Sequence, residues 1–227
     1  MAELAPLIAV VGCDGSGKST LAADLLAHLK KTRLAERSYL GLGSGAMGTK
    51  IKAWPIIGTA LERTLSNRAN RARDPKDKIP GILTALVLYG FSLRRKAKFE
   101  RVLSLRRSGI TVVTDRYPQT EVAGFYDGPG LSAARADGWV VSKLAARERI
   151  IYEWMASHIP TLVIRLHVDV DTAMARKPDH ARALIEKKVA ATPLLKFNNA
   201  PIVDLDATGL YEDERVAATQ AIDKVLG

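Results

Sequence analysis

The chain has 227 residues, 47% of them hydrophobic, and this length suits one large domain over residues 1–227. Its single cysteine, Cys13, excludes an intramolecular disulfide and favours a reducing, cytoplasmic location. The net charge of +10 favours partners that carry phosphate. The basic segment 63–107 lacks a regular interleaving of aromatic rings that could stack on bases, so nucleic acid is not an expected partner.

The first expected elements flank a glycine-rich loop. An apolar run at 7–11 predicts a buried strand, and 20–31 has helical spacing with its leucines on one face. Between them, residues 12–20 read Gly-Cys-Asp-Gly-Ser-Gly-Lys-Ser-Thr, a complete G-x-x-x-x-G-K-S phosphate-binding loop. Strand, loop and helix in this order predict a nucleoside triphosphate site. The loop residues expected to bind the nucleotide are Gly12, Asp14, Gly15, Ser16, Gly17, Lys18, Ser19 and Thr20.

Each residue type in this loop suits a bound triphosphate. The glycines allow backbone N–H groups to turn inward around the phosphates, and the following helix points its positive end at them. We expect Lys18 to reach the β- and γ-phosphates and the Ser19 hydroxyl to ligate Mg²⁺. Cys13 is expected to be a small filler residue in the loop rather than a reactive thiolate.

Further strands and helices alternate along the rest of the chain. The longest apolar stretch, 79–93, contains Pro80 and two glycines and is shorter than the ~20 residues that a membrane span needs, so we expect a core helix and no membrane span. Alternation of this kind predicts an α/β fold, with a parallel sheet and helices on both faces. The expected strands are 38–40, 110–114, 161–168 and 201–205, and the expected helices are 49–70, 80–107, 141–157, 171–176, 180–191 and 212–226.

The end of the strand at 110–114 carries a second candidate site. Asp115 follows this β-branched run directly, and ligands of parallel α/β sheets bind beyond the carboxyl ends of the strands. An aspartate there, beside a phosphate loop, can hold Mg²⁺ directly or through water. Arg116 can clamp phosphate oxygens with its planar guanidinium. We therefore expect Ser19 and Asp115 to form the metal site.

Four segments together resemble the thymidylate kinase family of nucleoside monophosphate kinases. They are the loop 12–20, Val-Thr-Asp-Arg-Tyr at 113–117, residues 166–176 and Val-Asp-Leu-Asp-Ala-Thr at 203–208. The resemblance implies a three-layer P-loop kinase fold and an ATP-dependent phosphotransferase that uses ATP and Mg²⁺. It also implies a phosphate acceptor that is a small molecule, most simply a nucleoside monophosphate, and a mobile lid near 176–192. A homodimer is left open.

The same resemblance implies roles for individual residues. Lys18, Asp14, Asp115, Arg116 and Arg176 would form the catalytic set. Within it Asp14 would face the acceptor's sugar hydroxyl, Arg116 would lie against a phosphate and Arg176 would open the lid. The loop at Ala207 and Thr208 would pack on the adenine of ATP. For Arg116, Arg176 and this loop, a purely structural role is the open alternative.

Departures from the family pattern gather on the acceptor side. Leu-Gly-Leu-Gly-Ser-Gly at 40–45 stands where the family has a Thr-Arg-Glu-Pro segment, and Ala-Gly-Phe at 123–125 replaces its Ala-Tyr-Gln. We expect thymidylate to be a poor acceptor, and Arg94 and Arg95 are candidates for the missing acceptor-phosphate interaction. The alternatives are a small-molecule kinase acting on a sugar or other metabolite, or a non-catalytic nucleotide-binding protein that uses its basic face to bind nucleic acid or an acidic surface.

Overall fold

A computed structural model describes residues 4–41, 81–124, 127–131 and 138–227 of the chain. Three of the expectations above fall outside these ranges. They are the helix at 49–70, most of the glycine-rich segment after residue 41, and the basic residues between 63 and 78.

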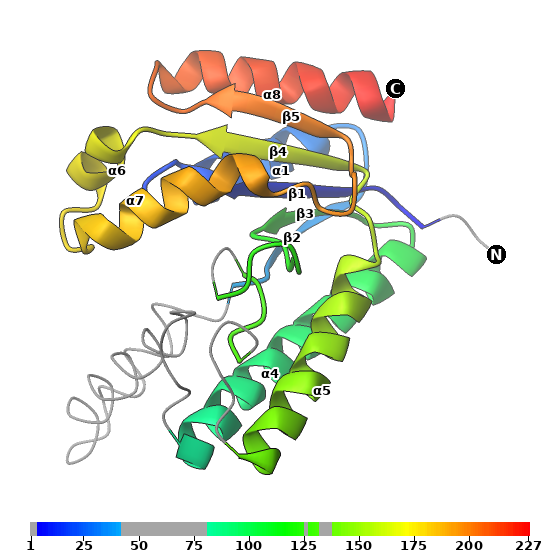
Figure 1. The fold of residues 1–227 in the computed structure, drawn as a ribbon. Coiled ribbons are helices and arrows are strands. Elements are labelled where there is room, and N and C mark those ends of the chain that lie inside the picture. Colours follow the sequence, from blue (N-terminus) through cyan, green and yellow to red (C-terminus); the bar gives the residue numbers. More distant parts are fainter. Residues whose placement is uncertain (1–3, 42–80, 125–126, 132–137) are drawn as a thin grey trace, which may run out of the picture.

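One parallel sheet of five strands organises the described residues (Figure 1). The strand order is β2-β3-β1-β4-β5, so the first strand lies at the centre. Because all five strands are parallel, their carboxyl ends meet at one edge of the sheet. The strands are β1 (Leu7–Gly12), β2 (Ala35–Tyr39), β3 (Thr111–Asp115), β4 (Leu162–His167) and β5 (Ile202–Asp206).

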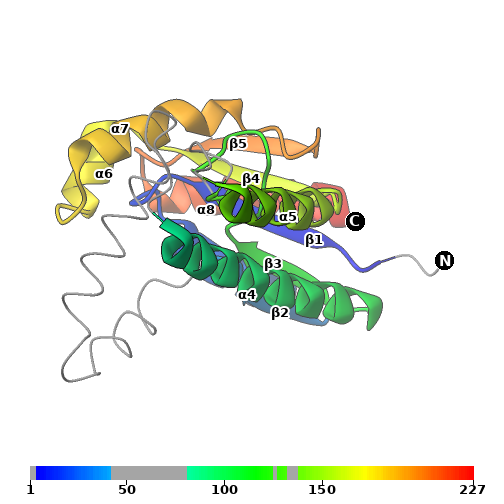
Figure 2. The ribbon, with the colours of Figure 1, turned by 60° about the horizontal axis from the view of Figure 1, so that its bottom comes forward.

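Helices cover both faces of this sheet, as Figures 1 and 2 show. Successive side chains of β1 point to opposite faces, and all six of its residues are buried. Ile8 and Val10 pack in the cluster that contains residues of α1 (Lys18–Leu29) and α8 (Tyr211–Leu226). Leu7, Ala9 and Val11 pack with residues of α4 (Gly81–Arg107) and α5 (Trp139–Ala156).

The observed elements confirm the expected α/β architecture. Each strand and helix predicted within the described ranges is present, with ends that differ by a few residues. The largest difference among the strands is in β2, which begins at Ala35 and pairs with β3 over its whole length. Its first residues read Ala-Glu-Arg and show no alternation of apolar and polar side chains. β2 lies at the edge of the sheet, where a strand can pair with its neighbour while it is only partly buried, so no apolar pattern marks its start. Gly109 ends α4 with a φ of 78°, a conformation that favours glycine.

The short helix α6 (Val170–Arg176) lies beyond the carboxyl ends of the strands, and α7 (Arg182–Ala191) runs back from there along the sheet to the 3₁₀ turn Thr192–Leu194 (Figure 1). The Asp169 carboxylate caps α6 by accepting a 2.7 Å hydrogen bond from the Thr172 N–H. Ala173 and Ile185 pack against Cys13 in a small apolar cluster. The buried Cys13 thus fills space between the loop and these helices, as expected. Within the described segments, no helix combines the length and the apolar character that a bilayer crossing requires.

Candidate active site

A cleft of about 600 Å³ opens at the carboxyl ends of the strands. It brings the phosphate loop and Asp115 together at this edge of the sheet, where both were expected from the sequence, and adds residues of β2 and of the end of α6. The predicted site residues that line it are Asp14, Gly15, Gly17, Lys18, Ser19, Thr20, Asp115, Arg116 and Arg176. Arg37, Tyr39, Lys177 and His180 line it as well.

The loop from Gly12 to Gly17 can close tightly because two of its glycines leave room for other backbone segments. Gly12 has a φ of 150°, and a Cβ there would lie 2.7 Å from the carbonyl oxygen of Leu166. Gly15 has a φ of 85°, and its Cβ would lie 2.9 Å from the carbonyl oxygen of Ala173. Neither position tolerates a side chain without moving backbone. Both glycines are therefore required by the path of the loop between β4 and α6.

Lys18 begins α1 and points into the loop rather than into solvent. Its Nζ donates a hydrogen bond to the Cys13 carbonyl oxygen, and the residue is only 6% exposed. Burial, followed by the charge of Arg116, lowers the pKa of Lys18 to about 8, although Asp14 and Asp115 act in the opposite direction. A bound polyphosphate would favour the charged ammonium. Lys18 is thus a buried cation whose charge a phosphate ligand would stabilise.

Ser19 and Asp115 form a direct contact between the loop and β3. The Ser19 hydroxyl donates to Asp115 Oδ2 at 2.6 Å, and an Arg37 guanidinium nitrogen donates to the same oxygen at 2.9 Å. Asp115 is 1% exposed, and among the described residues its Oδ1 has no hydrogen-bond partner. A buried carboxylate oxygen without a partner beside a serine hydroxyl fits a hard divalent cation.

No group of three or more histidine, cysteine, aspartate or glutamate side chains in the described part of the chain is arranged to hold a metal ion by itself. A Mg²⁺ ion at Ser19 and Asp115 would therefore take its remaining ligands from nucleotide phosphates and water. This is the usual composition of a Mg²⁺ site in phosphotransferases.

Asp14 is the centre of a cluster of cations. Its Oδ1 accepts a 3.0 Å hydrogen bond from Arg116, its Oδ2 contacts Lys188 Nζ, and His180 Nε2 lies 4.0 Å from that oxygen. Burial alone would raise the pKa of the Asp14 carboxyl, but Lys188, then Arg116 and Lys18, outweigh it and hold the pKa well below its ordinary value. The contact between Asp14 and Lys188 thus joins α7 to the loop.

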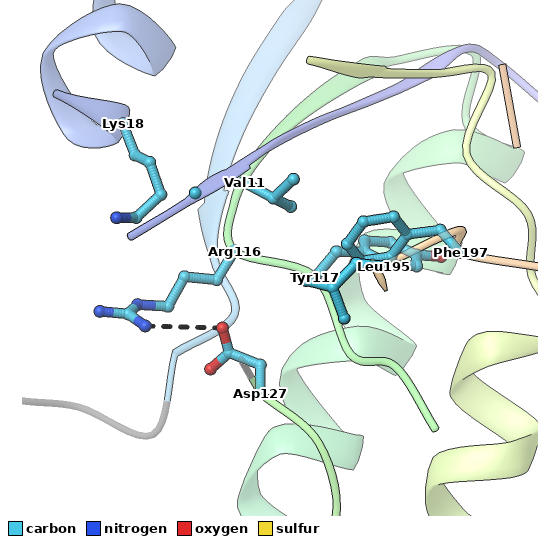
Figure 3. Close-up of a pocket in the computed structure, with 8 residues that line it drawn as sticks. Val11, Lys18, Arg116, Tyr117, Asp127, Leu195 and Phe197 are labelled. Atoms are coloured by element: carbon cyan, nitrogen blue, oxygen red, sulfur yellow. Dashed lines mark ion pairs between the residues drawn. The ribbon is translucent and has the colours of Figure 1, made fainter. Parts of the chain in front are cut away.

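Arg116 lines the cleft and also forms an ion pair with Asp127 (Figure 3). Its backbone has a φ of 74°, which is rare outside glycine, and its guanidinium lies 3.5 Å from Asp127 Oδ2. Asp127, then Asp14, raise the pKa of Arg116 against the effect of burial. Tyr117 follows and turns the other way, into the core, where its hydroxyl donates to the His158 carbonyl oxygen. The strained backbone at 116 therefore separates a charged side chain in the cleft from an aromatic ring in the core.

Arg95 does not reach the cleft. It is 1% exposed, and its guanidinium donates to Asp127 Oδ1 at 2.5 Å and to the Tyr152 hydroxyl at 2.9 Å. A cation already bonded in the core is poorly placed to supply an acceptor-phosphate interaction. Arg94 is exposed on α4. Neither of the two arginines expected on the acceptor side lines the cleft, and a role of Arg94 there stays a prediction.

Arg176 connects three parts of the site. One of its guanidinium nitrogens donates to the carbonyl oxygens of Gly15, at 3.2 Å, and of Ala207, at 2.8 Å. Ala207 is 2% exposed, and Thr208 donates through its backbone N–H and its hydroxyl to Asp206. The end of α6 is therefore tied to the phosphate loop and to the loop after β5. The packing of Ala207 and Thr208 on adenine and the motion of a lid both remain predictions.

Glu214 is a buried carboxyl group behind the phosphate loop that the sequence analysis did not identify. It is 7% exposed on α8, and a Cβ placed on Gly17 would lie 4.0 Å from its Oε1. Among the described residues, Oε1 has no hydrogen-bond partner. Burial raises the pKa of Glu214 to about 7, and Asp206 adds to this effect while Arg176 opposes it.

We predict that Glu214→Gln raises the melting temperature at pH 8 and changes it little at pH 5. Because the pKa is higher in the folded chain than in the unfolded chain, the folded state holds a proton that the unfolded state has lost between about pH 4.5 and 7. Stability contributed by that proton declines as pH rises through this window. Thermal denaturation of both proteins from pH 5 to 8 checks this, with substitution of the exposed Asp213 in the same helical turn, Asp213→Asn, as the control. Parallel pH profiles for wild type and Glu214→Gln would refute it.

Comparison with known proteins gives relatives that cover almost the whole chain. "Uncharacterized ATP-binding protein YghR" from Escherichia coli K12 is 44% identical over 220 residues, which are 96% of this chain and 87% of the relative. "Uncharacterized ATP-binding protein YghS" from the same strain is 44% identical over 222 residues, 97% of this chain and 93% of that relative. No protein-family model matches the chain.

Among solved structures, the deoxyadenosine kinase from M. mycoides with bound dATP superposes with a TM-score of 0.55. The match covers 96% of this chain and 99% of that one at 14% sequence identity, so it establishes the fold and nothing finer. The expected P-loop kinase fold is confirmed by this likeness and by the parallel sheet. Neither comparison identifies thymidylate as an acceptor.

Proposed function

This chain belongs to the family of ATP-binding proteins that includes YghR and YghS, and from this premise we propose that it is an ATP-dependent phosphotransferase. It would transfer the γ-phosphoryl group of ATP to a small acceptor of the nucleoside or nucleotide class. The observation that carries the proposal is the cleft itself. There Lys18 and Arg116 meet the Ser19–Asp115 pair at the carboxyl ends of adjacent strands.

In the proposed reaction, an acceptor oxygen attacks the γ-phosphorus in line. The bond between that phosphorus and the β–γ bridging oxygen breaks, and its electron pair leaves with ADP. Mg²⁺, held by Ser19 and Asp115 together with the nucleotide, would neutralise charge on the β- and γ-phosphate oxygens. Lys18 would stabilise the negative charge that develops on the leaving side, and Arg116 would do so on the acceptor side.

The remaining residues of the proposed site position these groups. Gly12, Gly15 and Gly17 give the loop its path, and Arg176 holds α6 against the loop and Ala207. With α6 and α7 in place over the loop, bulk water has less access to the phosphates, which limits wasteful hydrolysis. Asp14 keeps Arg116 and Lys188 beside the loop. Its assignment to the acceptor's sugar hydroxyl is a further part of the proposal.

The cations near the cleft bear on the choice between two classes of acceptor. A nucleoside monophosphate needs a cation for its own phosphate, and the resemblance to thymidylate kinases favours such an acceptor. The bonding of Arg95 to Asp127 favours the second candidate, a nucleoside whose hydroxyl accepts the phosphoryl group, because it removes one of the two expected phosphate ligands.

We predict that thymidylate is not a preferred acceptor. A site built to hydrogen-bond one base rejects others by up to ~10⁴-fold, and this chain lacks the family's thymine-binding sequence after Tyr117. The values of kcat/KM for thymidylate, the other nucleoside monophosphates, nucleosides and sugars, measured by coupled ADP release, check this prediction. A preference for thymidylate of several orders of magnitude would contradict it, and turnover with sugars alone would favour the broader small-molecule kinase.

A further inference from the structure

Arg37 forms an ion pair with one oxygen of Asp115, the carboxylate whose Oδ1, unpartnered in the described part of the chain, the proposed metal site uses. Its guanidinium lies 2.9 Å from Asp115 Oδ2, the oxygen that also accepts the Ser19 hydroxyl hydrogen. Among the described residues, Arg37 is the cation that forms an ion pair with Asp115. Because Asp115 is 1% exposed, its charge requires such a partner when no metal is present.

A divalent cation at the same carboxylate would conflict with this pairing. Two like charges a few ångströms apart repel strongly where water is scarce, and Asp115 lies in such a place. The two positive charges of Mg²⁺ and the single charge of Arg37 therefore compete for one buried anion. The Ser19 hydroxyl, which carries no net charge, does not compete in this way.

A nucleotide bound in the cleft would offer Arg37 partners other than Asp115. The Arg37 side chain is 31% exposed and lines the cleft together with Arg116 and Arg176, where the phosphates of a bound nucleotide are expected. An arginine released from Asp115 would find phosphate oxygens as new partners within the same cavity. The neighbouring strand residue Tyr39 borders the same space.

We propose that Arg37 pairs with Asp115 in the nucleotide-free protein and is displaced from it by the divalent cation that enters with the nucleotide. Arg37 thereby sets the metal affinity of the site and becomes available to the phosphates only after the metal has bound. This inference rests on the proposed function, because it uses the metal site assigned there. It adds a residue that neither the phosphate loop nor the Asp-Arg-Tyr motif contains.

The test measures metal binding without turnover. Mn²⁺ is titrated into the nucleotide-free protein, where Arg37 has no phosphate to contact, and free Mn²⁺ is followed by electron paramagnetic resonance. We expect Arg37→Met to bind Mn²⁺ roughly tenfold more tightly than wild type, since a repelling charge has been removed. We also expect Mn²⁺ alone to raise the melting temperature of Arg37→Met by more than it raises that of wild type.

Matched variants separate competition from damage to the fold. Arg101 of α4 lies 3.9 Å from Glu36, a residue of the same strand as Arg37, and does not line the cleft. The variant Arg101→Met should therefore bind Mn²⁺ as wild type does. Arg37→Lys keeps the charge and should also stay close to wild type. If Arg37→Met fails to fold, Arg37→Gln, which can still hydrogen-bond Asp115, is expected to show the same tightening.

Unchanged or weaker Mn²⁺ binding in both uncharged variants would overturn the competition. The transfer rate gives an independent reading, with kcat expected to fall by about 10²-fold in Arg37→Met in spite of the tighter metal binding. A kcat equal to that of wild type would show that Arg37 does not act on the phosphates. Failure of the wild-type protein to transfer phosphate would instead refute the proposed function. The Mn²⁺ titration would still decide whether Arg37 and the metal compete for Asp115.

Discussion

Replacing Lys18 with alanine is expected to lower the rate of phosphoryl transfer by at least ~10²-fold while the protein remains folded. The buried ammonium is the proposed partner of the charge that develops as the bond to ADP breaks. Its contribution cannot be supplied by Arg176, which is bonded to the carbonyl oxygens of Gly15 and Ala207. Water is a poor substitute for a charge as buried as that of Lys18.

The fold should survive this change because the charge of Lys18 does not stabilise the free protein. Burial lowers its pKa to about 8, so the folded chain holds this proton less tightly than the unfolded chain does. The substitution removes the hydrogen bond that Lys18 donates to the Cys13 carbonyl oxygen, which is a modest cost. Circular dichroism and thermal denaturation check the fold, and Lys30→Ala at the end of α1 serves as the control. Near-normal turnover in Lys18→Ala would be incompatible with the proposed chemistry.

The second large effect is expected at Asp115. Asp115→Asn keeps the shape of the side chain and removes the charge that would hold Mg²⁺. We expect the concentration of Mg²⁺ that gives half-maximal activity to rise by about tenfold or more, and kcat to fall more than ATP affinity does. An uncharged amide would still accept the Ser19 hydrogen bond, so local packing should be retained.

A Mg²⁺ titration at saturating ATP measures both effects of this change. Asp223→Asn is the matched control, because Asp223 is an exposed aspartate that pairs with His28 and does not line the cleft. If the Mg²⁺ profile of Asp115→Asn coincides with that of wild type, Asp115 does not hold the metal and its role is limited to pairing with Arg37.

The parts of this site that the sequence could predict are those with a local pattern. The loop 12–20 is contiguous, and its function follows from glycines and a lysine at fixed spacing after an apolar run. Asp115 is recognisable because it follows directly on a β-branched strand. In both cases the strand that positions the residue is buried on both faces and is therefore visible as an apolar run.

The ion pairs that surround this centre could not be predicted in the same way. Arg37 pairs with Asp115 across 78 positions, and Lys188 pairs with Asp14 across 174. Such pairs depend on which elements lie side by side and leave no periodic signal in the sequence. Glu214 was missed for the same reason, since a glutamate in the first turn of a helix ordinarily faces solvent.

The prediction that Arg95 could bind the acceptor phosphate was not supported, for a related reason. A basic run along a helix suggests an exposed face, whereas Asp127 and Tyr152 hold this residue in the core. Neither partner is close to Arg95 in the sequence, so the run of charges alone could not distinguish it from its exposed neighbour Arg94.

The proposed activity is tested most directly by following the γ-phosphoryl group itself. ATP labelled at the γ-phosphate is incubated with the protein, Mg²⁺ and a panel of nucleosides and nucleoside monophosphates, and both ADP and the labelled acceptor are quantified. We predict ADP and labelled acceptor in equal amounts, formed only when an acceptor is present and abolished in Lys18→Ala. ATP binding without a labelled product, or ADP released with inorganic phosphate at a rate that no acceptor changes, would contradict it.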